Sequence, residues 1–217
     1  MESFETGLGG SDGVVNVMGV RVPFHLAATG EHWAWNAGAV FAAAAASGLD
    51  PRQVAETLRT VDAEAGRGRA VQVALPKGGH FTLLDDAYNA NPVSMAAAIA
   101  SLGSAQPGRG GRRIAVLGDM LELGPQSPEL HRALAPALAE ANVDAVFSCG
   151  ALMRELHDHL PEGLRAGYAA NAGEGREMVA SAIRAGDVVL IKGSNGSGLH
   201  KIAAVLADGS AFNLTEA

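Results

Sequence analysis

The fold of this chain is indicated most clearly by residues 81–92, which read FTLLDDAYNANP. The first part of this stretch is a short apolar run of the kind that forms a buried β-strand. The run ends in two carboxylates, Asp85 and Asp86, and Asn91 and Pro92 then carry the signals of a helix start. A buried strand that leads through a polar loop into a helix predicts one unit of an α/β fold.

The same alternation continues along the chain after residue 70. Strands are predicted at 70–75, 81–85, 114–117, 145–149 and 188–191, and helices at 92–102, 128–141, 151–160, 174–184 and 197–207. This pattern favours a Rossmann-like α/β domain with a mostly parallel sheet and helices on both faces. Such sheets bind ligands at the carboxyl ends of their strands. The loops of interest are therefore 85–92, 118–128, 150 and 192–198.

The N-terminal part follows a different pattern. Residues 1–13 are rich in Gly, Ser and acidic residues without a period, so we expect either a frayed end or a cut edge of a domain there. Residues 63–69 hold three charged residues and two glycines and are the best candidate for a linker. We therefore expect two domains, residues 1–65 and residues 66–217. The elements expected in the first are a hairpin over 14–26, split by Gly19, and helices over 36–47 and 51–61.

Composition excludes several classes of function. The 217 residues are 48% hydrophobic and 18% charged, which suits a buried core, and the net charge of −7 argues against nucleic-acid binding through a basic patch. The single cysteine, Cys149, excludes an internal disulfide, and no spacing of His or Cys suggests a metal site. The longest apolar stretch, 37–49, is shorter than the about 20 residues of a membrane span, and no signal-peptide pattern is present. We expect a cytoplasmic protein with no nucleic-acid partner and no membrane insertion.

The loop after the first quoted strand carries four polar groups in a short space. Asp86 can accept hydrogen bonds from ribose hydroxyls, and Asn89 and Asn91 offer donors and acceptors to a polar substrate. The alternative is purely local, with Asn91 capping the helix and Asp85 capping the turn. Capping alone needs fewer polar residues than this loop contains, so a functional interpretation is favoured.

A second loop follows the strand at 114–117. Gly118 allows a sharp turn, Asp119 and Glu122 lie beside each other, and His131 can hydrogen-bond a carboxylate or an acyl group. The alternative makes Asp119 a turn residue and His131 a surface residue of a helix. The sequence supports both interpretations equally.

A third loop, VVLIKGSNGSG at 188–198, delivers Lys192 at the end of a buried strand. Its glycine spacing imitates a P-loop, but Leu199 and His200 stand where Lys and Ser or Thr are required. It is therefore not a Walker A site. Lys192 can still neutralise a carboxylate or a phosphoryl group. The alternative is a Gly-rich turn with an exposed lysine.

A fourth candidate lies at the start of the Ala-rich helix. His32 and Asn36 are four residues apart and can face one site. Trp33 and Trp35 either stack on a base or belong to the core, and the core interpretation is the better one. Arg67, in the linker, either contacts an anion or is simply solvated.

Taken together and in order, these segments resemble the Mur ligase family. The resemblance covers about residues 14–207 and is carried by DDAYNANPVSM at 85–95, LGDMLELG at 117–124 with His131, Lys192-Gly193-Ser194, the run from Gly30 to Asn36, and Arg67. The first of these segments is the most specific.

The resemblance implies an amide ligase of peptidoglycan precursor synthesis that uses ATP and Mg²⁺. Such an enzyme phosphorylates the carboxylate of a UDP-N-acetylmuramoyl tripeptide to an acyl phosphate, and the amine of D-alanyl-D-alanine then displaces phosphate. The residues carried over fall into three groups: Lys192, Asn89 and His131 as catalytic; His32, Asn36, Arg67 and Asp86 as nucleotide-binding; and Tyr88, Asn91, Asp119 and Ser194 as substrate-binding.

The chain departs from the family pattern at two points. Trp33 stands where the family usually has a polar residue, and no G-x-x-x-x-G-K-[ST] loop occurs anywhere in the sequence. We therefore expect the end of an ATP-binding central domain, to about residue 65, followed by a complete C-terminal domain. Such a chain is expected to be inactive alone and to work with a separate or missing N-terminal portion.

Two other interpretations remain open. The chain could be a non-catalytic module that binds a dipeptide, a nucleotide or a partner chain. It could also be another ligase of Mur type, such as a relative of folylpolyglutamate synthase. The run YNANP at 88–92 argues against the latter, because those relatives typically carry a His in this motif.

Overall fold

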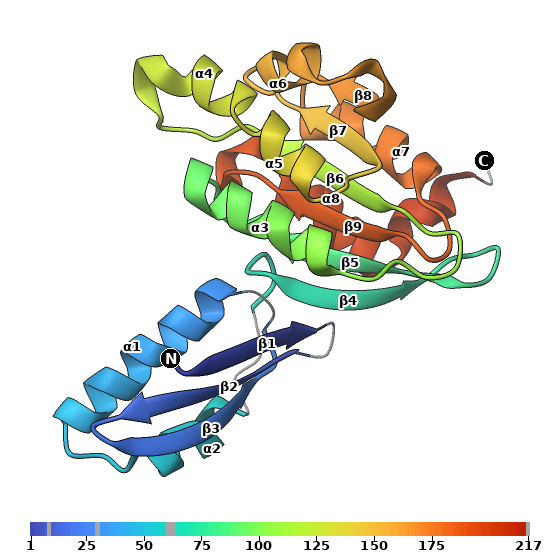
Figure 1. The fold of residues 1–217 in the computed structure, drawn as a ribbon. Coiled ribbons are helices and arrows are strands. Elements are labelled where there is room, and N and C mark those ends of the chain that lie inside the picture. Colours follow the sequence, from blue (N-terminus) through green and yellow to red (C-terminus); the bar gives the residue numbers. More distant parts are fainter. Residues whose placement is uncertain (8–9, 29–30, 60–63, 216–217) are drawn as a thin grey trace. The chain divides into compact units, whose positions relative to one another are not determined.

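The computed structural model describes residues 1–7, 10–28, 31–59 and 64–215. The chain divides into two compact units (Figure 1). Met1–Glu64 and Gly68–Ala70 form the first unit, and Ala65–Arg67 and Val71–Ala217 form the second. Each unit contains its own cluster of buried apolar side chains.

The first unit is a three-stranded antiparallel sheet packed against two helices. The sheet has the order β1-β2-β3. Phe24 of the sheet and Phe41 of the longer helix meet in the core, with ring centroids 5.4 Å apart. The elements are β1 (Ser3–Gly7), β2 (Gly10–Val17), β3 (Val20–Leu26), α1 (Glu31–Ala46) and α2 (Pro51–Leu58).

Two local predictions in this unit are confirmed. Val17 pairs with Val20, and Met18 and Gly19 between them both have positive φ, at 49° and 88°, as a tight hairpin turn requires. The side chain of Asp50 accepts a hydrogen bond from the Arg52 amide and caps α2.

The prediction of a frayed end over residues 1–13 is wrong. β1 and the first half of β2 occupy most of this stretch and pair with each other. Gly13 shows why the sequence misled: a Cβ there would lie 2.7 Å from the Phe24 ring. Here glycine makes room for a neighbouring side chain, whereas the sequence pattern suggested an irregular chain.

The second unit is built on a six-stranded sheet in the order β4-β5-β9-β6-β7-β8 (Figure 1). The last five strands in this order run parallel. β4 and β5 are joined by residues 75–79 alone, and so short a connection between neighbouring strands makes them antiparallel. The strands are β4 (Arg69–Ala74), β5 (His80–Asp86), β6 (Arg113–Gly118), β7 (Ala145–Cys149), β8 (Arg165–Ala169) and β9 (Val188–Lys192).

Helices cover both faces of this sheet. α7 and α8 pack on one face, where Val179 and Ile202 join the strand side chains in one buried cluster, and α3 and α5 lie on the other (Figure 1). The predicted Rossmann-like α/β architecture is confirmed. The helices are α3 (Pro92–Ser104), α4 (Ser127–Arg132), α5 (Ala135–Glu140), α6 (Arg154–His159), α7 (Ala172–Ala182) and α8 (Leu199–Ala207), with 3₁₀ turns at Gly124–Gln126, Glu162–Leu164, Asn195–Ser197 and Ser210–Thr215.

Two helix predictions in this unit need correction, and one strand was missed. The helix expected over 128–141 is two helices, α4 and α5, because Pro136 has no amide hydrogen and its ring excludes a continuous helix back to Arg132. The helix expected over 151–160 begins only at Arg154. β8 was not predicted, since RAGYA at 165–169 lacks the apolar run of the central strands; it is an edge strand.

Candidate functional site

The carboxyl ends of three neighbouring strands bring the candidate loops together. In the sheet, Asp86 of β5 is paired with Lys192 of β9, and Lys192 is paired with Leu117 of β6. The loops that follow these strands therefore start side by side. This confirms the prediction that the polar loops meet at one edge of the sheet.

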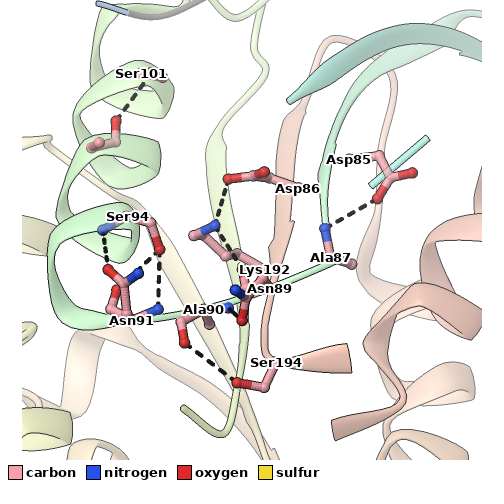
Figure 2. Close-up of polar contacts among 11 residues, drawn as sticks. Asp85, Asp86, Ala87, Asn89, Ala90, Asn91, Ser94, Ser101, Lys192 and Ser194 are labelled. Atoms are coloured by element: carbon pink, nitrogen blue, oxygen red, sulfur yellow. Dashed lines mark hydrogen bonds and ion pairs between the residues drawn. The ribbon is translucent and has the colours of Figure 1, made fainter. Parts of the chain in front are cut away.

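Lys192 lies between two of these loops. Its ammonium Nζ donates to Asp86 Oδ2 at 2.6 Å and to the backbone oxygen of Asn89 at 3.0 Å (Figure 2). The Lys192 side chain is only 3% exposed and that of Asp86 is 20% exposed. A charge buried to this degree needs such partners, because desolvation disfavours an isolated ammonium. The lysine expected to neutralise a ligand is thus paired within the protein.

Ser194 forms a second link between loops. Its Oγ accepts a hydrogen bond from the Leu121 amide at 3.0 Å and donates a longer one, 3.4 Å, to the Ala90 carbonyl. Its own amide donates to the backbone oxygen of Asp119 at 3.0 Å. Ser194 is 6% exposed. The residue expected to bind substrate therefore joins the loops after β5, β6 and β9.

Small residues let the loops after β6 and β9 approach each other closely. A Cβ on Gly193 would lie 2.6 Å from Ser197 Oγ and 3.0 Å from Gly118 Cα. Any larger residue at Gly193 would push these loops apart. The glycine-rich sequence after β9 thus serves close packing of backbones.

His131 is completely buried and has structural partners on both ring nitrogens. Nε2 accepts from the Met120 amide at 3.0 Å, and Nδ1 lies 2.6 Å from the Ser127 carbonyl, to which it donates. These bonds fix a neutral ring with its proton on Nδ1. In the structure the ring anchors the loop after β6 to α4, and a catalytic role of His131 stays a prediction.

Asp119 holds the next strand-end loop. Its Oδ1 accepts a hydrogen bond from the Met153 amide at 2.8 Å, just before α6. Gly150 follows β7, and a Cβ there would lie 2.3 Å from this carboxylate oxygen. The sequence singled out Asp119 and Gly150 separately but gave no signal that they touch.

The local capping contacts predicted for Asp85 and Asn91 are present. Asn91 caps α3, where its side chain accepts from the Ser94 amide and the Ser94 side chain accepts from the Asn91 amide (Figure 2). Asp85 Oδ1 accepts from the Ala87 amide at 3.3 Å. A substrate contact by Asn91 stays a prediction.

The segment around Gly66 packs against the same loop, a contact that the sequence did not reveal. The Gly66 amide donates to Asp85 Oδ2 at 2.9 Å, and its carbonyl accepts from the Tyr88 amide at 3.0 Å. The guanidinium of Arg67 lies over the Tyr88 ring, 4.0 Å from its centroid. Arg67 is therefore held beside Tyr88 at the carboxyl edge of β5.

Three predicted site residues in the loop after β5 are exposed: Tyr88, Asn89 and the capping residue Asn91. Tyr88 is 48% exposed, and Asn89, whose side-chain oxygen accepts from the Ala90 amide at 2.8 Å, is also exposed. They project from a loop whose backbone is held on its inner side by Lys192 and Ser194. These are the predicted site residues in this loop best placed to touch a ligand.

The remaining nucleotide candidates belong to the first unit. Asn36 is exposed on α1. The side chain of His32 lies outside the described residues. Trp33 is partly buried against the core of this unit, as the core interpretation expects, whereas Trp35 is 64% exposed.

Within the described ranges, no group of three or more His, Cys, Asp and Glu side chains could hold a metal ion. The sequence has no G-x-x-x-x-G-K-[ST] loop, and Lys192 is already paired with Asp86. No helix in the described part of the chain is long and apolar enough to cross a membrane.

Comparison with models of protein families shows the family of this chain. Residues 66–195, which hold the loops after β5 and β6 and the start of the loop after β9, match the family described as Mur ligase, glutamate ligase domain. The chain belongs to the Mur ligase family. The resemblance inferred from the motifs is thus confirmed.

Two curated relatives carry one and the same enzyme name. The chain is 32% identical over 211 residues to the UDP-N-acetylmuramoyl-tripeptide–D-alanyl-D-alanine ligase of Treponema pallidum, covering 94% of this chain and 42% of that one. It is 29% identical over 189 residues to the enzyme of that name from Bacillus subtilis, covering 86% and 40%. The chain thus spans about two fifths of the length of these Mur ligases.

Solved structures of Mur ligases have a similar fold. The similarity to MurF from Acinetobacter baumannii has a TM-score of 0.79 at 25% identity and covers 94% of this chain and 44% of that one. MurF ligase from Thermotoga maritima, solved in complex with ADP, has a TM-score of 0.77 at 19% identity and covers 97% and 46%. The second likeness concerns the fold alone.

Proposed function

We propose that this chain contributes the C-terminal domain, residues 66–217, and the last part of the ATP-binding central domain, residues 1–65, to a peptidoglycan ligase. The reaction is the ATP-dependent addition of D-alanyl-D-alanine to a UDP-N-acetylmuramoyl tripeptide. The observation that carries this proposal is the convergence of three family-matched loops at the carboxyl edge of the sheet. The names of the curated relatives support the choice of substrates.

The roles proposed for individual residues come from the family resemblance, and exposure supports those of Tyr88 and Asn89. Tyr88 and Asn89 face solvent at the sheet edge and meet the substrates. Arg67, held over Tyr88, faces the nucleotide phosphates. Asn36 and His32 contribute on the adenine side, and Asp86 contributes toward the ribose while it remains paired with Lys192.

The 217 residues alone are proposed to lack ligase activity. An acyl phosphate can form only where phosphate and magnesium are held, and the sequence has no G-x-x-x-x-G-K-[ST] loop for this purpose. The phosphate-binding loop is therefore supplied by another segment or chain. Phosphate release from ATP by the purified 217-residue chain, with both substrates present, would contradict this part of the proposal.

Binding of the dipeptide tests the remaining part. The ¹⁵N-labelled chain is titrated with D-alanyl-D-alanine, and amide shifts are followed by NMR. We expect saturable shifts confined to the loops at 86–91, 118–122 and 193–196, and weaker or absent shifts with L-alanyl-L-alanine. Asn89→Ala should reduce the affinity.

A matched control is available at the opposite end of the same strand. Lys77 is exposed in the turn before β5, so Lys77→Ala should bind the dipeptide like the parent chain. Shifts that are scattered over the surface, or equal for both dipeptides, would argue against a dipeptide site. Specific binding without any gain of ligase activity on adding a complementary N-terminal portion would favour a non-catalytic binding module.

A further inference from the structure

The loop after β5 is held from its inner side by two residues of the loop after β9. Lys192 Nζ donates to the Asn89 carbonyl at 3.0 Å, and Ser194 Oγ donates to the next carbonyl, that of Ala90, at 3.4 Å (Figure 2). Two consecutive carbonyls of one loop are thus bound by side chains two residues apart. This arrangement fixes the path of the backbone at Asn89 and Ala90.

The ion pair adds a stronger constraint at the start of the loop. Lys192 and Asp86 are 106 residues apart in sequence, and their charged atoms are 2.6 Å apart. If the ammonium left to meet a ligand, both this ion pair and its hydrogen bond to the Asn89 carbonyl would be broken. Separating the two charges of a largely buried ion pair is strongly unfavourable.

Tyr88 and Asn89 of the same loop have exposed side chains. Tyr88 is 48% exposed and Asn89 is exposed, while Lys192 is 3% exposed as a side chain. A ligand that approaches the sheet edge from solvent therefore meets Tyr88 and Asn89 before it could reach the ammonium.

We infer that Lys192 is a positioning residue, which shapes the loop Asp86–Ala90 by pairing with Asp86 and the Asn89 carbonyl, and that it does not bind the carboxylate of the dipeptide. The choice of ligand rests on the proposed function. The state of the ammonium and its effect on the loop can be tested without any ligand.

The first test measures whether the ammonium is enclosed. The chain has three lysines, Lys77, Lys192 and Lys201, of which the first and last are exposed and serve as internal controls. On reductive methylation, followed by mass spectrometry, Lys192 should react at least about ten-fold more slowly than both controls. Asp86→Asn should raise its rate toward theirs. Equal rates for all three lysines in the parent chain would overturn the inference.

The second test measures the effect on the loop. Lys192→Met should displace the amide resonances of Asn89 and Ala90, and Lys192→Arg, which keeps the charge, should restore them at least in part. Lys77→Met is the matched control and should leave them unchanged. Unaltered Asn89 and Ala90 resonances in a folded Lys192→Met chain would overturn the inference. Should that variant fail to fold, Asp86→Asn gives the same readout.

The third test separates positioning from direct contact. Affinities for D-alanyl-D-alanine and for its C-terminal amide, which lacks the carboxylate, are measured with the parent chain and with Lys192→Met. A positioning role predicts that the variant weakens both ligands by the same factor. If Lys192 bound the carboxylate, only the acid would lose affinity, by a factor of about 10 to 100, and the inference would be wrong. If the parent chain binds neither ligand, the dipeptide assignment fails, while the first two tests still decide the role of Lys192.

Discussion

The Nε2 atom of His131 and the backbone amide of Met120 are joined by a fully buried hydrogen bond of 3.0 Å. The other ring nitrogen donates to the Ser127 carbonyl, so the ring connects α4 with the loop that follows β6. The next amide in that loop, of Leu121, donates to Ser194. The histidine thus supports the polar edge of the sheet from inside the protein.

Replacement of His131 by Leu should therefore destabilise the second unit. It leaves the Met120 amide buried without an acceptor, which costs about 1–3 kcal/mol. Urea unfolding monitored by circular dichroism measures the effect. His200→Leu is the control, because His200 is exposed, and its change should stay within about 0.5 kcal/mol. Equal stabilities of the two variants would show that the buried bond contributes nothing.

At the opposite end of the sheet, replacement of Asp187 should cost more unfolding free energy than replacement of any other carboxylate. Its side chain, with 0% exposure, accepts from the amides of Arg112 and Arg184 and from the Arg112 guanidinium at 2.7 Å. Asp187→Ala leaves these donors without their acceptor and should cost about 3–5 kcal/mol of unfolding free energy. Asp158→Ala removes only an exposed 3.9 Å pair with Arg154 and should cost less than about 1 kcal/mol. A small loss for Asp187→Ala would contradict the structural role assigned here.

Cys149 should be unreactive in the folded protein. Burial, and to a lesser extent the nearby Asp119 carboxylate, raises the pKa of this thiol to about 12. The ordinary value is about 9, so at pH 8 the thiolate fraction falls roughly 1,000-fold. Labelling with a thiol reagent should follow unfolding of the second unit and become fast in denaturant. Rapid labelling of the native chain at pH 8 would show that the strand end at β7 is open to solvent.

His157 should make stability fall in mildly acidic solution. Burial lowers the pKa of this imidazole, with Arg165 and Arg154 acting in the same direction and Asp158 opposing them. Because the folded-state pKa lies below the unfolded value of about 6.5, the unfolded chain binds the proton more readily, and stability decreases as the pH falls below 6.5. His157→Gln should remove part of this decrease, and His80→Gln, at an exposed site, should not. The test compares the unfolding free energy of each chain at pH 7 and pH 5. If this free energy fell by the same amount in the parent and His157→Gln chains, the prediction would be wrong.

Much of the fold was predictable because it depends on local patterns. The apolar runs at 81–85, 114–117, 145–149 and 188–191 become four neighbouring parallel strands, and their polar loops meet as expected. Elements without such a pattern were missed. β1, which reads SFETG, contains a glycine and a charged residue, and β8 reads RAGYA. Both depend on pairing with a neighbouring strand, which the sequence of the segment does not encode.

By itself, the sequence determined which loops carry polar chemistry and that they share one edge of a sheet, because strand periodicity and the direction of parallel strands follow from local patterns. Only the tertiary structure decided which side chains face inward. Lys192, Ser194 and His131 are buried and bonded within the protein, whereas Tyr88 and Asn89 remain exposed. The physical reason is that a polar side chain at a strand end has the same local signature in either role. Its partner, such as Asp86 for Lys192 at a separation of 106 residues, is brought to it only by the order of the strands.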